Sequence, residues 1–381
     1  MAQQDREIFF ENAANHSIAK IMLLKEYLTI WIRKITYGLK SKCLICDTFA
    51  GEGIYSDGTK GSPFVILDVV QDYLNQMPNS YEVYLAFIEA DNNNFILLKK
   101  NLEEYLKVEI QPNKFVTCGN GKLNVMVSNS KHQDFLEGLQ KSVGQLIPSL
   151  FFIDPFGFKG VSLQQLTALM NKYNACEVLV NFMYEEFNRF KRIDSIAKTL
   201  NDFFGSDVCK LVESVNEMNP KDRRNTIIAE YKKNCKDNKI KYVLDFDIQK
   251  DDSAAFKMAL IFMSNNSHGF NVMKSAMLKL CKNVEFEYLT CEAKKPSLFS
   301  FCEEDWLLDE MKSELFNKFH GQSVTRDEVD KYCREHQFIP DEKVPAILKG
   351  LSIEHKVFIL KDGGKKVYPK QFRKENAIYF E

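Results

Sequence analysis

The sequence predicts an α/β fold, in which a parallel sheet carries helices on both faces and a smaller helical domain follows it. Three observations support this prediction. Short apolar runs alternate with amphipathic stretches from residue 18 to residue 280. Several of these runs end in an acidic residue or a glycine turn, as buried parallel strands do where they meet a ligand loop. Beyond residue 295 the pattern changes to helices and a basic hairpin.

The elements of the sheet region can be assigned in order. Apolar residues at helical spacing predict an amphipathic helix over 18–35 that packs on the sheet. Residues 193–236 look wholly helical and are interpreted as an insertion or cap, and 270–280 as a late helix. The remaining predicted strands are 43–49, 84–89, 114–118, 150–153, 177–182, 240–248 and 256–263, and the remaining helices are 63–73, 94–105, 135–143 and 163–170.

A domain boundary is expected at Lys294-Lys-Pro296-Ser, which gives domains 1–295 and 296–381. In the second domain, Thr325 and Glu328 form the pattern of a helix capping box. Helices are predicted over 305–319, 329–336 and 341–351, and a hairpin over 356–360 and 365–368 with a glycine turn. Three helices and a hairpin are the order of a winged helix, whose third helix and wing usually meet nucleic acid.

Composition and charge narrow the class of protein. The 381 residues are 45% apolar, and no apolar run approaches the roughly 20 residues that span a bilayer. The N-terminus lacks the layout of a secretion signal, so a cytoplasmic protein without membrane contact is expected. The net charge is −1, but from His355 to Lys374 seven Lys or Arg residues stand against one acid. This basic tail, with Lys365 and Lys366 in the predicted wing, favours nucleic acid as a partner.

Ten cysteines do not indicate a metal site or disulfides. Eight are scattered singly, and only Cys43 and Cys46 form a C-x-x-C pair. That pair lies inside a predicted strand, where residues three apart point to opposite faces. We therefore expect buried, reduced thiols and no metal.

The first candidate site residues follow the first two predicted strands. Asp47 ends an apolar run and leads into Gly51 and Gly53, which lack the Cβ atoms that would keep a ligand from the backbone. Glu89 ends the second strand, where a carboxylate can accept hydrogen bonds from a ribose, although a solvated carboxylate is the plain alternative. Asn120, in a glycine-bearing turn after 114–118, can flank a nucleobase edge or belong to an ordinary turn.

The fourth and fifth strands supply the second group of candidates. Asp154 and Pro155 close an apolar run and begin a rigid turn through Gly157, in which Asp154 can accept a hydrogen bond from an amine. The side chains that can line a substrate pocket here are aromatic, basic or amide-bearing: Phe156, Phe158, Lys159, Asn181 and Arg189. For Asn181 and Arg189 a structural or surface role is equally open.

Together these motifs resemble class I S-adenosylmethionine-dependent methyltransferases, and more closely the three-Cys-motif partner (TcmP) family. The resemblance covers most of residues 16–280, and the part that follows resembles the winged helix-turn-helix domain often fused to such proteins. It rests on a first helix with Lys20, then Asp47-x-Phe-Ala-Gly51-x-Gly53, Gly61-Ser-Pro63, Phe87-Ile-Glu89, Asp154-Pro-Phe-Gly157 and Asn181-Phe182. It implies a Rossmann-like methyltransferase sheet, with a three-Cys-motif protein as a partner.

The resemblance also implies roles for individual residues. Asp47, Phe49, Ala50, Gly51 and Gly53 would hold the methionine part of S-adenosyl-L-methionine, Glu89 its ribose, and Asn120 would lie near its adenine. Asp154, Pro155, Phe156 and Gly157 would match the target-amine motif. Tyr55 stands where the usual cofactor loop has a third glycine, and Phe156 and Gly157 replace a second proline and an aromatic of the common amino-methylating motif.

Two functions of different classes follow from these patterns. The first is an enzyme that transfers a methyl group from S-adenosyl-L-methionine to a nucleic-acid base, with an exocyclic amine as the target. The second is a catalytically weak or inactive module of the same fold that binds nucleic acid or a partner protein.

Overall fold

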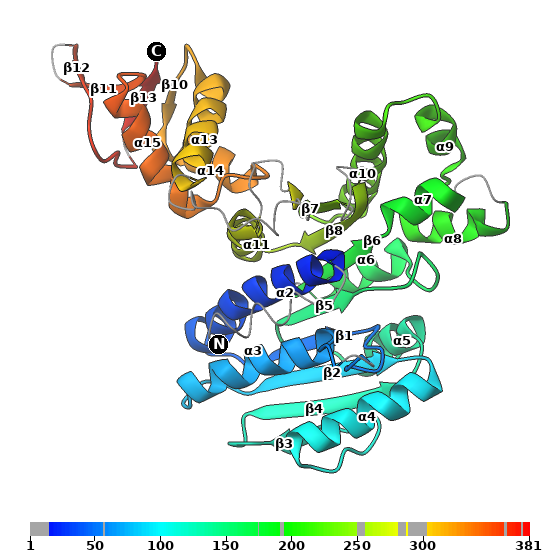
Figure 1. Cartoon of the computed structure of the whole chain (residues 1–381). Helices are drawn as coiled ribbons and strands as arrows, with labels where there is room; N and C mark the ends of the chain where they lie inside the picture. The colour runs from blue at the N-terminus through cyan, green and yellow to red at the C-terminus, as the bar shows by residue number, and fades with distance from the viewer. Residues whose placement is uncertain are drawn as a thin grey trace. The chain divides into compact units, whose positions relative to one another are not determined.

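The computed structural model describes residues 15–55, 58–173, 175–190, 194–249, 256–280, 287–288, 303–361, 364–374 and 376–381. They form two compact units, Met1–Phe270 and Asn271–Glu381, which are coloured blue to yellow-green and yellow-green to red in Figure 1. The boundary that the sequence predicts near residue 295 lies outside the described residues. Each unit has a hydrophobic core of its own.

The described strands of the first unit form one sheet in the order β3-β4-β2-β1-β5-β6-β8-β7 (Figure 1). Neighbouring strands among β4, β2, β1, β5 and β6 are parallel, and β8 lies antiparallel to both β6 and β7. The strands are β1 (Cys43–Asp47), β2 (Val83–Glu89), β3 (Val116–Cys118), β4 (Leu123–Asn129), β5 (Ser149–Ile153), β6 (Cys176–Phe182), β7 (Tyr242–Gln249) and β8 (Phe256–Ser264). The predicted α/β fold is confirmed.

The central strands are buried along their whole length. Every residue of β1, β5 and β6 is buried, and most of these residues are apolar, as is typical of parallel strands that are covered on both faces. Helices α2 and α3 pack on one another, as do α5 and α6. Two helices, α2 (Asn15–Arg33) and η1 (Lys34–Gly38), precede β1. The helices between strands β1 and β6 are α3 (Ser62–Gln76), α4 (Asn92–Leu106), α5 (His132–Ser142) and α6 (Leu163–Lys172).

The strand order indicates where a ligand would be expected to bind. Along the chain, β1 pairs first with β2 on one side, and β5 then adds to its other side. In open α/β sheets, ligands bind beyond the carboxyl ends of the strands where the order reverses in this way. Here that point lies at the ends of β1 and β5, where β1 ends at Asp47 and β5 is followed by Asp154-Pro155.

The direction of one predicted strand is wrong. The sequence prediction made 114–118 the third parallel strand, but β3 is a short edge strand that runs antiparallel to β4. The third parallel strand is β4, which was not predicted, because Asn124 and Ser128 interrupt its apolar run. Both polar side chains are nevertheless buried. The turn after β3, with Asn120, therefore lies at the amino end of β4, away from the carboxyl ends of the parallel strands.

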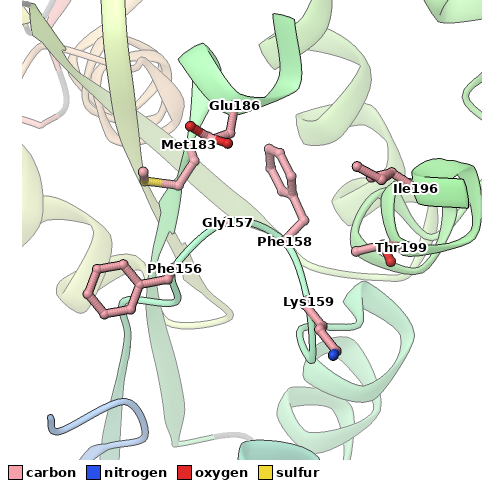
Figure 2. Close-up of a pocket in the computed structure, with 8 residues that line it drawn as sticks. All are labelled: Phe156, Gly157, Phe158, Lys159, Met183, Glu186, Ile196 and Thr199. Atoms are coloured by element: carbon pink, nitrogen blue, oxygen red, sulfur yellow. The ribbon is translucent and has the colours of Figure 1, made fainter. Parts of the chain in front are cut away.

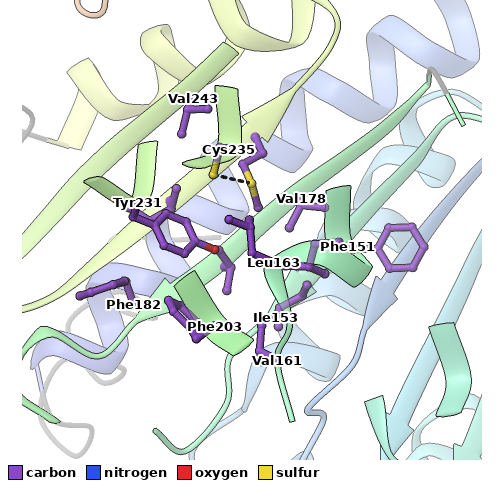
Figure 3. Packing of buried hydrophobic residues seen from close by; sticks show 14 of the residues in the cluster. Phe151, Ile153, Val161, Leu163, Val178, Phe182, Phe203, Tyr231, Cys235 and Val243 are labelled. Atoms are coloured by element: carbon purple, nitrogen blue, oxygen red, sulfur yellow. Dashed lines mark hydrogen bonds between the residues drawn. The ribbon is translucent and has the colours of Figure 1, made fainter. Parts of the chain in front are cut away.

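In its described residues, the segment 193–236 that was predicted to be helical forms three helices, α8 (Asp194–Phe204), α9 (Cys209–Val215) and α10 (Pro220–Asp237). A further helix, α7 (Tyr184–Phe190), precedes this segment. An aromatic cluster joins α7, α8 and α10 to the sheet, and Figure 3 shows part of it. Its members are Phe158, Phe182, Phe187, Phe203, Phe204 and Tyr231.

A buried ion network joins α10 to β7. Arg224 donates to Asp245 and to Asp247, and Lys232 Nζ donates to Asp245 at 2.7 Å. All four side chains are largely buried. The opposed charges hold the pKa of Asp245 below its usual value against the effect of burial.

The second unit has the predicted order of three helices and a hairpin. They are α13 (Glu303–Phe319), α14 (Arg326–Glu335) and α15 (Val344–Ile353), with η2 (Asp341–Lys343) before α15 and β11 (Val357–Lys361) paired to β12 (Lys365–Val367) after it. The capping box of Thr325 and Glu328 is present at the start of α14. The sheet runs β10-β13-β11-β12, where β10 is Ser323–Thr325 and β13 is Ala377–Phe380. Helix α11 (Ser267–Leu280) spans the division between the units, and β9 is Glu287–Tyr288.

Two features of composition can be checked against the structure. Of the cysteines in the described residues, all but Cys209 are buried, Cys43 and Cys46 included. Within the described ranges, no helix combines the length and the apolar character needed to cross a membrane.

Candidate cofactor and substrate site

Polar side chains gather at the carboxyl ends of four neighbouring parallel strands. Asp47 ends β1 and Glu89 ends β2, Asp154 follows β5, and Asn181 is the second-last residue of β6. Since these strands lie side by side, the sheet brings together residues that are far apart in sequence. The sequence predicted all four.

Asp47 is fully buried beneath the loop that follows β1. Its carboxylate accepts hydrogen bonds from Ser62 Oγ at 2.6 Å and from the Phe49 N–H at 3.2 Å. Burial, with a smaller contribution from the charges of Asp154 and Glu89, raises the pKa of Asp47 to about 7 against the lowering effect of these hydrogen bonds. Asp47 therefore changes its charge near neutral pH.

The Glu89 carboxylate holds two loops in place by accepting a backbone N–H from each. Oε2 accepts the Gly51 N–H at 2.8 Å and Oε1 accepts the Asp91 N–H at 2.7 Å. Because each carboxylate oxygen has two lone pairs and Glu89 is only half-buried, an acceptor site remains for a ligand hydroxyl. The structure thus gives Glu89 a loop-positioning role that leaves the predicted ribose contact open.

The two glycines of the loop have different surroundings, and so they are glycines for different reasons. Gly51 has φ +60°, and a Cβ added there would have no heavy atom within 4 Å, so its free side faces open space. Gly53 has φ +79°, and an added Cβ would lie 2.7 Å from Phe64 and 2.8 Å from Leu98. The packing of α3 and α4 therefore already requires a glycine at Gly53, whereas Gly51 leaves room for a ligand.

His132 supports this loop from behind, and sequence reasoning did not identify it. The ring stacks on Phe49 at 5.2 Å between centroids, and Nδ1 lies 2.9 Å from Thr48 Oγ1. Ala50, the next loop residue, is buried. Burial lowers the pKa of His132 to about 4, so the imidazole is neutral at physiological pH. The only signal for it was its place after β4, the strand that the sequence reading missed.

Asn120 does not belong to this group of residues. It lies in the β3–β4 turn, where its Oδ1 accepts the Lys122 N–H at 3.2 Å. The prediction that it lies near the ligand edge is wrong, because β3 is antiparallel to β4. The residue that β4 brings to the carboxyl edge is Asn129, whose Nδ2 donates to the Glu89 carbonyl at 2.9 Å.

Asp154 is held by two donors from different elements. Lys20 Nζ, from α2, donates to Oδ2 at 2.5 Å, and Asn181 Nδ2 donates to Oδ1 at 2.7 Å. Asn181 is buried, while the side chain of Asp154 remains 23% exposed. The sequence placed Lys20 in the first helix but predicted no contact with Asp154.

The turn after Asp154 sends its two aromatic rings in different directions. Phe156 is fully exposed, whereas Phe158 is 5% exposed and packs its ring against Phe182 and Phe203. Gly157 between them has φ +81°, which a residue with a side chain rarely adopts. Most of the Phe158 ring is therefore packed in the core, and Phe156 is the ring that is exposed to solvent.

A pocket of about 470 Å³ opens beside this turn (Figure 2). It lies between the turn and helices α7 and α8, and Figure 2 shows Met183 and Glu186 on one side of it and Ile196 and Thr199 on another. Its lining residues are Phe156, Gly157, Phe158, Lys159, Met183, Glu186, Ile196 and Thr199. Arg189 is exposed on α7 and pairs with Glu186 at 3.6 Å, outside this lining.

In the second unit, the two predicted wing lysines have different surroundings. Lys365 is exposed on β12. Lys366 pairs with Glu381, and its Nζ lies 4.4 Å from the centre of the Phe358 ring. Lys366 is therefore already engaged within the unit.

No model of a known protein family matches the chain, and no curated protein matches it in sequence. Solved structures resemble it at low identity. A protein from Legionella pneumophila is 12% identical over 67% of this chain and 86% of that chain, with a TM-score of 0.37. Trm1 from Pyrococcus horikoshii, in complex with S-adenosyl-L-methionine, is 9% identical over 95% of this chain and 90% of that chain, with a TM-score of 0.36.

A third structure is the plantazolicin methyltransferase BamL in complex with a triazolic desmethylPZN analog and SAH. It is 11% identical over 69% of this chain and 90% of that chain, with a TM-score of 0.30. At identities and TM-scores this low, the function of this chain has to be argued from its own residues.

Proposed function

We propose that this protein is an S-adenosyl-L-methionine-dependent methyltransferase that acts on an exocyclic amine of a nucleic-acid base. The observation that supports this most strongly is the position of two aspartates. Asp47 ends β1 and Asp154 directly follows β5, and these are the two strands on either side of the point where the strand order reverses. A loop with space for a cofactor and an acceptor for an amine are therefore neighbours.

The residues present fit this cofactor. Gly51 offers backbone with open space in front of it, Asp47 supplies a buried carboxylate under the loop, and Glu89 retains acceptor capacity for ribose hydroxyls. When bound, S-adenosyl-L-methionine supplies an electrophilic methyl group. The chain's own task is to hold donor and amine in line, since this transfer needs little acid–base help.

The target amine would be oriented by the turn after β5. The partly exposed Asp154 carboxylate, with the Pro155 carbonyl, would accept its N–H groups, and Phe156 would stack on the flat base. The adjacent pocket of about 470 Å³ falls within the size range of small-molecule sites. Lys159, in its lining, is a candidate for a phosphate contact, as is the exposed Arg189 on α7.

The second unit supports a nucleic-acid substrate. Its three helices and hairpin have the order of a winged helix, and Lys365 is an exposed cation in the hairpin. Membership of the three-Cys-motif partner family, with a partner protein of that kind, is part of the same proposal and rests on the sequence motifs.

Cofactor binding can be tested by calorimetry with S-adenosyl-L-methionine and its demethylated product. Glu89→Ala should weaken the binding of both compounds by about ten-fold or more, because the Gly51 loop loses the hydrogen bond that holds it. Glu82→Ala is the matched control, since Glu82 precedes the amino end of β2 and pairs with Lys42 there. If the wild-type chain binds neither compound, or if Glu89→Ala binds like wild type, this cofactor site is excluded.

Transfer can then be tested with a labelled methyl group and total RNA or DNA. Asp154→Ala should abolish transfer while leaving cofactor binding within about two-fold, because the residue orients the amine and not the donor. Cofactor binding without transfer to either nucleic acid would favour the alternative, a module of this fold that binds nucleic acid or a partner without turnover.

A further inference from the structure

Lys20 and Asp154 form an ion pair inside the candidate site. Lys20 Nζ lies 2.5 Å from Asp154 Oδ2, and the two side chains are only 12% and 23% exposed. Lys20 comes from α2 and Asp154 from the turn after β5, so the contact is made by the tertiary fold. Such a partly buried pair is held more firmly than the exposed ion pairs of a protein surface.

The pair leaves room for one more donor on the carboxylate. Lys20 Nζ donates to Asp154 Oδ2, and Asn181 Nδ2 donates to Asp154 Oδ1 at 2.7 Å, so the carboxylate is held from two sides. Each oxygen can accept a second hydrogen bond, and Asp154 remains partly exposed. An incoming amine can therefore bind Asp154 without displacing Lys20.

The charges around Asp154 decide what kind of amine that is. Asp47 from β1 adds a second carboxyl, Asn181 from β6 is neutral, and Lys20 from α2 supplies the positive charge in direct contact. A bare carboxylate would attract an ammonium group, whereas a carboxylate already neutralised by Lys20 offers hydrogen-bond acceptance with little net charge. Base amines are uncharged at neutral pH, while alkylamines and lysine side chains are cations.

We propose that Lys20 is a positioning and specificity-determining residue: it fixes and neutralises Asp154, so that the site accepts an uncharged planar amine and discriminates against ammonium groups. This inference rests on the proposed function, which it deepens by naming the charge state of the target.

The test is to remove Lys20 by substitution and then to add a small ammonium compound that can take the place of its charge. Lys20→Ala should lower kcat by about ten-fold or more, because Asp154 is no longer held in position. KM for the cofactor should stay within about two-fold of the wild-type value, because the substitution does not touch the cofactor loop. Added n-propylammonium should restore much of kcat in Lys20→Ala, and Lys20→Arg should keep most of it. Lys20→Met, which retains the apolar stem, should show the same loss without the cavity.

The matched control is Lys99→Ala, which breaks the Lys99–Glu103 pair of 2.7 Å in α4, with side chains 29% and 25% exposed. It should leave kcat unchanged and show no rescue. Wild-type transfer should not be inhibited by n-propylammonium, because the Asp154 carboxylate is already paired with Lys20. Unchanged or increased kcat in Lys20→Met, or competition between n-propylammonium and nucleic acid in the wild type, would overturn the proposal.

A second measurement separates this inference from the proposed function. n-Propylammonium should raise the melting temperature of Lys20→Ala but not of the double variant Lys20→Ala/Asp154→Asn, whatever the chain methylates. If the chain has no transfer activity but shows this difference in melting temperature, the proposed function is refuted and the inference about Lys20 and Asp154 stands. Equal stabilisation of both variants would show that the amine does not occupy the Lys20 position, and would sink the inference.

Discussion

Asp47 and Asp154 are both aspartates at the ends of neighbouring strands, yet their surroundings differ. Asp47 is fully buried and accepts hydrogen bonds from Ser62 and Phe49. Asp154 is partly exposed and paired with Lys20. Environment, and not residue type, therefore separates a carboxyl that supports a loop from one that can face a substrate.

The pH dependence of cofactor binding follows from Asp47. Its pKa is raised from 3.8 to about 7 by burial, so this carboxyl favours the folded state while protonated, and that contribution is lost as the pH rises through 7. A loop that holds a cationic ligand needs the ionised form instead. We therefore expect the affinity for S-adenosyl-L-methionine to fall by up to about ten-fold per pH unit below pH 7.

Calorimetry between about pH 6 and pH 8 measures this slope. Asp47→Asn removes the titrating group, so its affinity should be lower at high pH and nearly independent of pH. An equal slope in Asp47→Asn and wild type would assign the titration to another group.

At the scale of elements, the aromatic cluster connects the substrate turn to the helical segment. Phe158 leaves the turn and packs against Phe182 of β6 and Phe203 of α8. The turn is thereby anchored on one side of Gly157, while Phe156 on the other side is left in solvent. Helix α8, which supplies Phe203 to the cluster, also supplies Ile196 and Thr199 to the pocket wall.

Two phenylalanines of this turn should respond oppositely to truncation. Phe158→Ala should lower the free energy of unfolding by about 3 to 5 kcal/mol, because it leaves a cavity in the core. Phe156→Ala should change it by less than about 0.5 kcal/mol, because the ring is exposed, while it weakens nucleic-acid methylation. Urea unfolding and transfer assays on both variants check this, and a large stability loss in Phe156→Ala would contradict the assignment.

Prediction from the sequence succeeded for elements whose apolar pattern is continuous. β1 and β5 are buried throughout, and no polar residue interrupts either run between its ends. It failed for β4, where Asn124 and Ser128 break the run although the fold buries both. Since a strand's direction depends on its partner and not on its own residues, the antiparallel pairing of β3 was equally invisible, and the placement of Asn120 failed with it.

On the scale of the whole molecule, two units divide the proposed work between them. The first holds the candidate site, and the second carries the basic hairpin. Lys365 and Lys366 are adjacent in sequence, but Lys366 is paired with Glu381 and lies over Phe358. Their contributions to nucleic-acid binding should therefore differ.

Lys365→Ala should weaken nucleic-acid binding at low salt and reduce the slope of log affinity against log salt by about 1. Lys366→Ala should have a smaller effect on that slope, because its charge is already shared with Glu381. Binding titrations over a series of salt concentrations measure both. An unchanged slope in Lys365→Ala would count against a nucleic-acid role for this hairpin.

The sequence by itself determined the alternating architecture, the glycine loop after Asp47 and the polar ends of β2 and β5, because apolar periodicity and turn residues act locally. Only the tertiary structure decided which of these groups meet. The contact of Lys20 with Asp154, and of His132 with Thr48, joins residues 134 and 84 positions apart. Such contacts depend on how helices pack on the sheet, which no local pattern encodes.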